Sequence, residues 1–244
     1  MTQAPPQIRI GTSGWVYPHW RDAFYPAGLP QADWLRYYAA RLHSVEINGS
    51  FYRLPGEAAV ADWCDEVSQD FVFAVKASRY ITHMKKLREP EATWPPFIER
   101  MAGLGKHLGP ILFQLPPRWR VNLERLQGLL EALGGKYRAA FEFRDPSWFD
   151  DRVYALLEKH GAALCIYELA GFKSPHEVTA DFVYLRLHGP SGAYQGCYSP
   201  QRLSAWARRL HDWQAQGRGV YCYFDNDEAG YAAHNALQLQ RYMR

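Results

Sequence analysis

The chain is poor in cysteine, and this scarcity excludes several classes of protein at the start. Only 4 of its 244 residues are cysteine, and no two of them follow the C-x-x-C spacing of redox or zinc motifs. A chain of this length builds its core without the disulfides that small secreted domains need. We therefore expect a reduced, cytoplasmic setting. The four cysteines are Cys64, Cys165, Cys197 and Cys222.

Long apolar runs and an excess of one charge are also absent. No run approaches the roughly 18–20 residues that a helix needs to span a bilayer, and residues 1–6 lack the basic start of a secretory leader. The net charge is only +3, whereas nucleic-acid binders usually carry a dense basic stripe. We expect no membrane contact and do not favour nucleic acid as a partner. A small anionic ligand is compatible with this charge.

Apolar residues recur in short runs rich in β-branched and aromatic side chains, and helical patterns separate most of these runs. We expect strands at residues 8–11, 44–48, 71–76, 111–115, 139–144, 163–167, 182–188 and 220–224. We expect helices at residues 32–42, 58–67, 97–108, 123–133, 152–160, 200–216 and 229–242.

Eight strands that alternate with helices predict an α/β protein with a parallel sheet closed into a (β/α)8 barrel of the TIM type. An open doubly wound sheet is the alternative, but no glycine fingerprint follows the first strand. The segment between Tyr167 and Asp181 is too short for a packed helix and is interrupted by Gly171 and Pro175. We therefore expect an irregular sixth connection. No linker divides the chain, so residues 1–244 are expected to form a single domain.

Three of the expected strands end in the same alternation of apolar and polar residues. Side chains two positions apart share one face of a strand. The polar pairs are Glu46 and Asn48, Glu142 and Arg144, and Arg186 and His188. The apolar residues expected to face the helices are Val45, Ile47, Phe141, Phe143, Leu185 and Leu187. The polar pairs would then face the barrel mouth at the carboxyl ends of the strands, together with Lys76, Gln114 and Asp225. A structural ion-pair network is the alternative interpretation, because buried charges must pair.

Six motifs are spread along nearly the whole chain. They are Gly11-Thr12-Ser13-Gly14-Trp15, Glu46-Ile47-Asn48 with Ser50-Phe51-Tyr52, Phe73-Ala74-Val75-Lys76, Phe113-Gln114-Leu115-Pro116-Pro117, Phe141-Glu142-Phe143-Arg144 and Tyr184-Leu185-Arg186-Leu187-His188-Gly189. This set resembles the YecE-like family, domain of unknown function 72. The resemblance implies a (β/α)8 barrel, in agreement with the strand count, and implies no established reaction. One departure is Asp225-Asn226-Asp227, where related sequences carry an Asn-Asn pair.

An anion site is the chemistry that these positions favour most. Arg186 and His188 precede a glycine-rich turn, and a helix is expected shortly after Asn226. Loops after strands seven and eight of such barrels commonly bind phosphate, through backbone N–H groups and a helix amino terminus. Two alternatives stay open. One is a glycosidase that uses Glu46 and Glu142, and the other is a metal-dependent hydrolase or isomerase that adds His188 and Asp225 to these carboxylates.

We interpret the chain as an enzyme that acts on a small anionic ligand, including phosphorylated compounds, at the barrel mouth. The expected catalytic residues are Glu142, Glu46, His188 and Lys76. The expected ligand-binding residues are Arg186, Arg144, Asn48, Tyr52, Gln114 and Asn226. Glu142 is the first choice as general acid or base, because Arg144 beside it can tune its protonation. We expect neither a metal ion nor a cofactor. A non-enzymatic barrel that binds a metabolite or nucleic acid is the competing interpretation.

Overall fold

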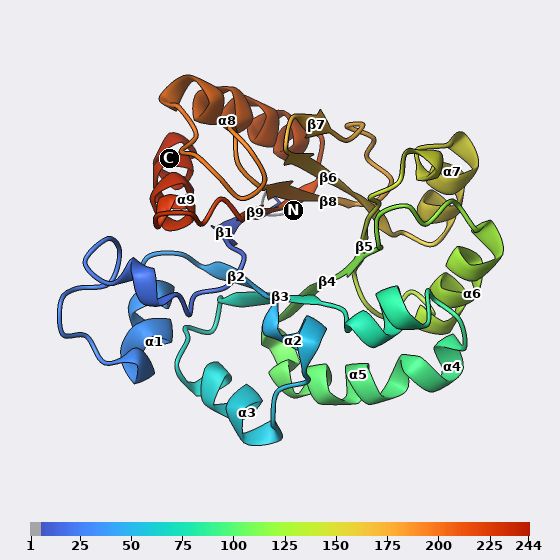
Figure 1. Ribbon diagram of the computed structural model, residues 1–244, viewed down its shortest axis with the longest axis horizontal. Coiled ribbons are helices and arrows are strands. Elements are labelled where there is room, and N and C mark those ends of the chain that lie inside the picture. The colour runs from blue at the N-terminus through green and yellow to red at the C-terminus, as the bar shows by residue number, and fades with distance from the viewer. Residues whose placement is uncertain (1–5) are drawn as a thin grey trace, which may run out of the picture.

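A computed structural model describes residues 6–244 of the chain, and residues 1–5, which carry most of the leader prediction, lie outside the described part. Eight parallel strands form a barrel, and helices surround it as an outer layer (Figure 1). The predicted (β/α)8 architecture is therefore confirmed. The barrel strands are β1 Ile8–Thr12, β2 Ser44–Ile47, β3 Val72–Lys76, β4 Leu108–Gln114, β5 Ala139–Glu142, β6 Ala163–Leu169, β8 Phe182–Leu187 and β9 Gly219–Phe224.

The strands follow the order β1-β9-β8-β6-β5-β4-β3-β2 around the barrel, and each neighbouring pair in this order is parallel. The barrel closes between β1 and β2 at their carboxyl ends, where Ser13 bridges Glu46. The Gly14 N–H donates to the Glu46 carbonyl at 2.8 Å at the same point. Closure places the ends of β1 and β2 on the rim that the other strands form.

A tyrosine hydroxyl replaces part of the backbone pairing between β1 and β2. Tyr38, in α1 (Trp34–Ala39), accepts from the Thr12 N–H at 2.9 Å and donates to the Ser44 carbonyl at 2.9 Å. The two strands approach closely here, since a Cβ atom on Gly11 would lie 2.0 Å from the Ser44 carbonyl oxygen. Only glycine allows this approach.

Helix α6 (Leu123–Leu133) begins and ends at typical capping residues. Asn122 starts α6 by accepting a hydrogen bond from the Arg125 N–H at 2.9 Å, and Gly134 ends it in the left-handed conformation. None of the helices in residues 6–244 is long and apolar enough to cross a membrane. The remaining α-helices are α2 Gly49–Tyr52, α3 Glu57–Asp65, α4 Pro90–Thr93, α5 Pro95–Met101, α6 Leu123–Leu133, α7 Asp151–Lys159, α8 Pro200–Ala215 and α9 Tyr231–Tyr242.

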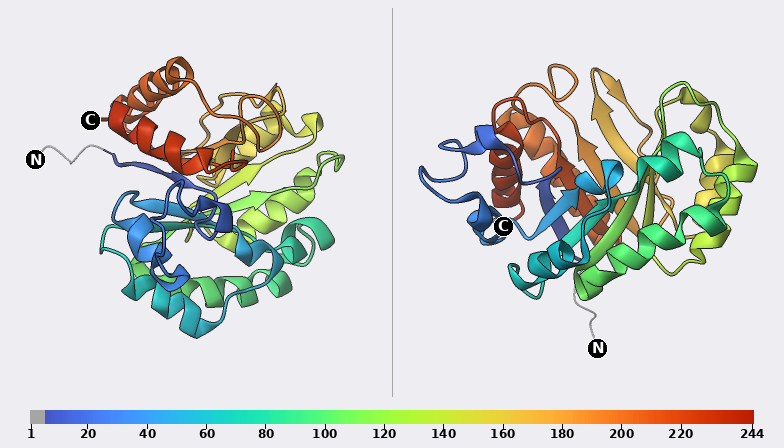
Figure 2. Two further views of the ribbon diagram at one scale, coloured as in Figure 1. Left: turned by 60° about the vertical axis from the view of Figure 1, so that its left-hand side comes forward. Right: turned by 60° about the horizontal axis from the view of Figure 1, so that its bottom comes forward.

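Two connections depart from a single regular helix. The helix predicted over residues 97–108 is wrong beyond Met101, because the chain tightens there into a 3-10 segment in which Gly105 has φ of 53°. In the sixth connection, β7 (Phe172–Lys173) turns back and pairs antiparallel with the end of β6, as expected of an irregular segment. The β6–β7 ribbon projects beyond the neighbouring strands (Figure 2, right).

The barrel has an outer and an inner apolar layer. The outer layer, between strands and helices, contains all the outward-facing residues that the alternation predicts: Val45, Ile47, Phe141, Phe143, Leu185 and Leu187. Inside the barrel, small Ala74, Ala140 and Ala163 share a cluster with large Tyr184 and Tyr223. Side chains of unequal size thus fill the interior, as is usual in this fold. The polar side chains gather above this filled interior.

Candidate functional site

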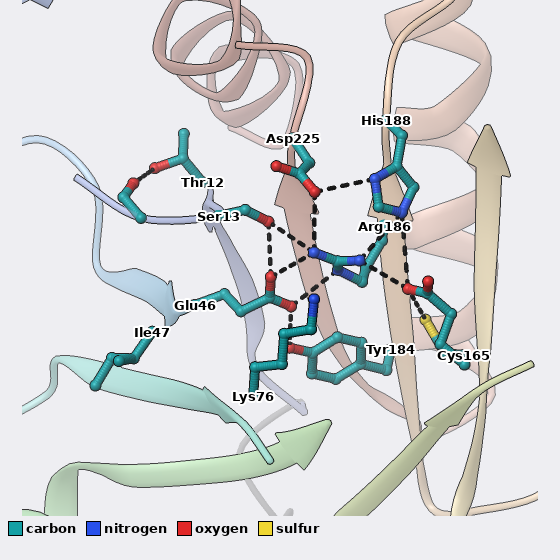
Figure 3. A network of polar contacts seen from close by, with 12 residues as sticks. Thr12, Ser13, Glu46, Ile47, Lys76, Cys165, Tyr184, Arg186, His188 and Asp225 are labelled. Atoms are coloured by element: carbon teal, nitrogen blue, oxygen red, sulfur yellow. Dashed lines mark hydrogen bonds and ion pairs between the residues drawn. The ribbon is translucent and has the colours of Figure 1, made fainter. Parts of the chain in front are cut away.

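Arg186 lies at the centre of a buried ion-pair network at the carboxyl ends of the strands (Figure 3). Its side chain is 1% exposed. Nε and Nη2 donate to the two carboxylate oxygens of Glu46 at 3.0 and 2.7 Å, and Nη1 donates to Glu142 Oε2 at 2.8 Å. A two-pronged contact of this kind is stronger than a neutral hydrogen bond. The two glutamates therefore meet at one point, as predicted, and a shared guanidinium holds them there.

Asp225 and His188 complete the network on the side of β8 and β9. Asp225 Oδ2 lies 3.0 Å from Arg186 Nη2 and 3.0 Å from His188 Nδ1. His188 Nε2 lies 3.1 Å from Arg186 Nη1, and an arginine nitrogen can only donate. Nε2 is therefore the acceptor in this contact, and Nδ1 faces Asp225. Within residues 6–244 no three His, Cys, Asp or Glu side chains form a group that could hold a metal ion.

Glu46 is fully occupied by the protein. Besides Arg186, it accepts hydrogen bonds from Ser13 Oγ and from the Tyr184 hydroxyl, both at 2.7 Å. The predictions from sequence missed these two donors. Tyr184 could have been found, because it lies two residues before Arg186 on the same face of the strand. With four donors on one buried carboxylate, we assign Glu46 to the support of Arg186.

Glu142 is held as a carboxylate. Burial alone raises its pKa, but Arg144 and Arg186 outweigh burial and hold the pKa of Glu142 well below its usual range. Arg144 forms an ion pair with Glu142, and its Nη2 also lies 3.3 Å from His188 Nε2. The prediction that Arg144 tunes Glu142 is consistent with this geometry. The direction of the pKa shift, however, argues against Glu142 as a general acid.

Lys76 is the cation of this region that the network leaves out. Lys76 is the last residue of β3, and its side chain lies beside the network (Figure 3). Its amine lies 4.5 Å from the centre of the Phe51 ring. Within residues 6–244 no carboxylate oxygen lies within 4.0 Å of the amine, and the amine makes no hydrogen bond. Burial and the nearby Arg186 lower the pKa of Lys76, although the carboxylates oppose this. The expectation that Lys76 is catalytic stays a prediction.

A hollow of about 460 Å³ opens at the mouth over β4, β5 and β6. Its polar lining includes Gln114, Arg144 and Tyr194. Within the described residues, Arg144 Nη1, the Gln114 amide and the Tyr194 hydroxyl make no hydrogen bond, so their donors are free. The apolar lining is Pro117, Pro146, Phe149, Tyr167, Leu169 and Phe172. The sequence indicated Gln114 and Arg144 for ligand binding, and it missed the aromatic residues of the β6–β7 ribbon.

Asn48 belongs to a different hollow, of about 490 Å³, under the loop that follows β1. The lining there includes Trp15, Leu35 of α1 and Trp63 of α3. Asn48 has left the extended conformation, with φ −95° and ψ −23°, and it starts α2. The expectation that Asn48 continues the face of Glu46 is wrong for this reason, since two residues share a face only while the strand continues.

The other expected ligand-binding residues take structural or exposed positions. Tyr52 is 74% exposed on α2. The Asn226 amide is buried and donates to the Gly196 carbonyl at 2.8 Å and to Asn235 Oδ1 at 2.9 Å. Asn226 therefore ties the loop before α8 to α9. Each of the three nitrogens of Arg186 donates to a protein acceptor, and the expectation that Arg186 binds a ligand directly stays a prediction.

Comparisons with known proteins agree with this architecture. Residues 9–244 match the family described as "Protein of unknown function DUF72". The UPF0759 protein YunF of Bacillus subtilis is 25% identical over 270 aligned positions, which cover 95% of this chain and 93% of YunF. The UPF0759 protein YecE of Escherichia coli K12 is 30% identical over 143 positions, covering 58% of this chain and 50% of YecE.

The same family recurs among solved structures. A DUF72 family protein from Thermotoga maritima superposes with a TM-score of 0.87 at 27% identity, covering 96% of this chain and 98% of the other. A DUF72 family protein from Enterococcus faecalis gives a TM-score of 0.84 at 22% identity, covering 97% and 95%. None of these names states a reaction. The resemblance seen in the motifs is confirmed, and the chain belongs to the DUF72 family.

Proposed function

We propose that the protein is an enzyme that binds a small anionic ligand in the hollow over β4, β5 and β6. The observation that carries this proposal is the set of unused donors in one hollow: Arg144 Nη1, the Gln114 amide and the Tyr194 hydroxyl. Polar groups without partners in a concave site are typical of ligand binding. A guanidinium with one free edge suits a carboxylate or a phosphate.

The buried network supports this role by fixing Arg144. Glu142 binds Arg144 on one edge, and Arg186 holds Glu142 from the other side. The Arg144 guanidinium also lies over the Tyr167 ring, 4.9 Å from its centre. These contacts already restrict the Arg144 side chain, so less conformational entropy is lost when a ligand binds. Glu46, Glu142 and His188 act in this proposal as positioning residues.

The geometry does not favour the glycosidase alternative. A glycosidase needs one carboxyl group that is protonated and can donate to the leaving group. Glu46 and Glu142 both bind Arg186, and neither side chain is exposed. Lys76 lies beside the network, and within residues 6–244 no acidic side chain pairs with it.

The test is a binding measurement with simple anions. Inorganic phosphate, pyrophosphate and small carboxylates would be titrated by calorimetry into the parent protein and into Gln114→Leu and Arg144→Gln. A hydrogen bond to a charged group contributes about 1.5–3 kcal/mol, so we expect binding to weaken by roughly ten- to a hundredfold. Gln114→Leu leaves the ion pairs intact and thus reports on the hollow alone.

Two surface changes serve as matched controls. Gln127→Leu alters an exposed glutamine of α6, and Arg152→Gln alters an exposed arginine of α7. Both should bind like the parent. Equal affinity in folded Gln114→Leu, Arg144→Gln and the controls would refute the ligand site. Binding in the hollow without conversion of the bound compounds, followed by NMR, would refute the enzymatic part and favour a metabolite-binding barrel.

A further inference from the structure

Within residues 6–244 the Lys76 amine differs from the charged groups of the buried network because no acidic side chain pairs with it. The carboxylate of Glu46 pairs with Arg186, and that of Glu142 pairs with Arg144. The third carboxylate, Asp225, faces His188 and Arg186. Within residues 6–244 the amine accordingly has no oxygen of an acidic side chain within 4.0 Å. Because the two arginines pair with all three carboxylates, the Lys76 amine is left without an acidic partner.

The surroundings of Lys76 favour the uncharged form of its amine. The side chain is only partly exposed, and removal from water disfavours its charged form. Burial, followed by the positive charge of Arg186, lowers the pKa of Lys76. An enclosed lysine next to another cation is the usual arrangement of a nucleophilic lysine. Only the neutral amine has the lone pair that attacks carbon.

The sheet places this amine close to the anion-binding donors. Lys76 is paired with Leu112 in the register of β3 and β4, and Gln114 lies two residues further along on the same face. Gln114 is in turn paired with Glu142 across β4 and β5. Arg144 follows Glu142 by two residues. Three adjacent strand ends therefore bring together one nucleophile and two donors for an anion.

We propose that Lys76 Nζ forms an imine with the carbonyl carbon of a small anionic aldehyde or ketone whose anionic group is bound by Arg144 and Gln114. This inference rests on the proposed function and names its substrate class. The neutral amine adds to the carbonyl carbon and gives a carbinolamine, in which the former carbonyl oxygen takes up the proton that nitrogen releases. The hydroxyl group then leaves as water together with the second proton of the nitrogen, and the nitrogen lone pair forms the C=N bond. Hydrolysis reverses both steps, so neither an oxidant nor a reductant is consumed.

The experiment traps the imine by reduction. The full-length protein is incubated with pyruvate, glyoxylate or dihydroxyacetone phosphate, with and without sodium borohydride, and is then measured by intact mass and peptide mapping. Borohydride delivers a hydride to the imine carbon and leaves a stable secondary amine on the lysine. We expect an adduct that requires both carbonyl compound and borohydride, located on Lys76 at least tenfold above the exposed Lys136 and Lys159.

Two variants separate a specific imine from chance reaction. Lys76→Arg keeps the positive charge and cannot form an imine, so the adduct should disappear while phosphate binding persists. Gln114→Leu keeps Lys76 but weakens the anion contact, so labelling at a limiting carbonyl concentration should fall several-fold. Equal labelling of all lysines, or no labelling of Lys76 by any of the three compounds, would overturn the inference.

The outcomes also distinguish this inference from the proposed function. Anion binding that depends on Gln114 and Arg144, together with an unlabelled Lys76, would refute the imine and leave the ligand site standing. Labelling of Lys76 that is the same in Gln114→Leu and in the parent would support the nucleophile and refute the anion contact. Loss of both results would refute both.

Discussion

Replacing Arg186 by methionine tests whether the network is as charged and as buried as its geometry implies. Methionine has a similar length and no charge, so the change leaves Glu46, Glu142 and Asp225 without their shared partner. Removing one partner of a buried ion pair costs about 3–5 kcal/mol. Glu46 keeps two hydroxyl donors and Glu142 keeps Arg144, so we expect a loss of about 4 kcal/mol at pH 7 rather than several times that value.

The stability difference between Arg186→Met and the parent should depend on pH. In the parent, the pKa values of Glu142 and Asp225 are lowered, so this stabilisation is complete above their ordinary values and is lost as the pH falls through the folded values. Without Arg186, burial raises the pKa of the abandoned carboxyl groups instead. Their stabilising contribution is then present at low pH and is lost as the pH rises. The deficit of the variant should therefore be largest at pH 7 and should decrease as the pH falls toward 4.

Urea unfolding followed by tryptophan fluorescence at several pH values measures this deficit. For a chain of this length a loss of about 4 kcal/mol lowers Tm by roughly 10–15 °C. Arg152→Met is the control, because that arginine is exposed and its surface ion pair contributes little to stability. Adding Glu46→Gln should restore part of the stability of Arg186→Met while destabilising the parent. A loss of stability below about 1 kcal/mol, or one that does not change with pH, would refute the assignment of Arg186 as the shared partner of the three carboxylates.

Three further changes test how the barrel closes and how its rim responds to pH. Tyr38→Phe leaves the Thr12 N–H and the Ser44 carbonyl unpaired and should cost about 2–4 kcal/mol in urea unfolding, whereas a neutral result would show that water replaces the hydroxyl. Gly11→Ala forces a methyl group against a backbone oxygen and should lower Tm strongly or prevent folding, and a parent-like Tm would contradict the close approach of β1 and β2. Burial raises the pKa of Asp227 from 3.8 to about 6, so ionisation destabilises the fold as the pH rises from about 4 to 6. The Tm difference between Asp227→Asn and the parent should therefore shift in favour of the variant between pH 4.5 and pH 7.5, and a constant difference would contradict this.

Strand positions and the faces of the strands were predictable because local periodicity determines them. The alternation around Glu46, Glu142 and Arg186 correctly indicated which side chains face inward, since a strand has only two faces. Tyr184 shares the inward face of its strand with Arg186, but tyrosine is common in apolar cores, so its residue type alone does not indicate a polar contact. The predictions failed where the strand ended early, as at Asn48, whose helical backbone conformation redirects its side chain.

The distribution of partners within the network could not be predicted from composition. Three carboxylates and three cations suggest three pairs, and the sequence offers no means of ranking them. In the folded protein a guanidinium can serve several oxygens at once from its rigid fork, whereas an ammonium is a single point charge. Arg186 accordingly satisfies Glu46, Glu142 and Asp225 together, and Arg144 reinforces Glu142.

This difference between arginine and lysine decides what the mouth can do. Because two arginines are sufficient for three acids, Lys76 has no acidic partner within residues 6–244, and Arg144 is left to line the hollow. A cluster whose charge count suggests a structural network therefore also contains a lysine without an acidic partner and an arginine that lines the hollow. Under the proposed function, the two interpretations of the strand-end charges hold together: the buried half of the cluster is structural, and it positions the half that lines the hollow for a ligand.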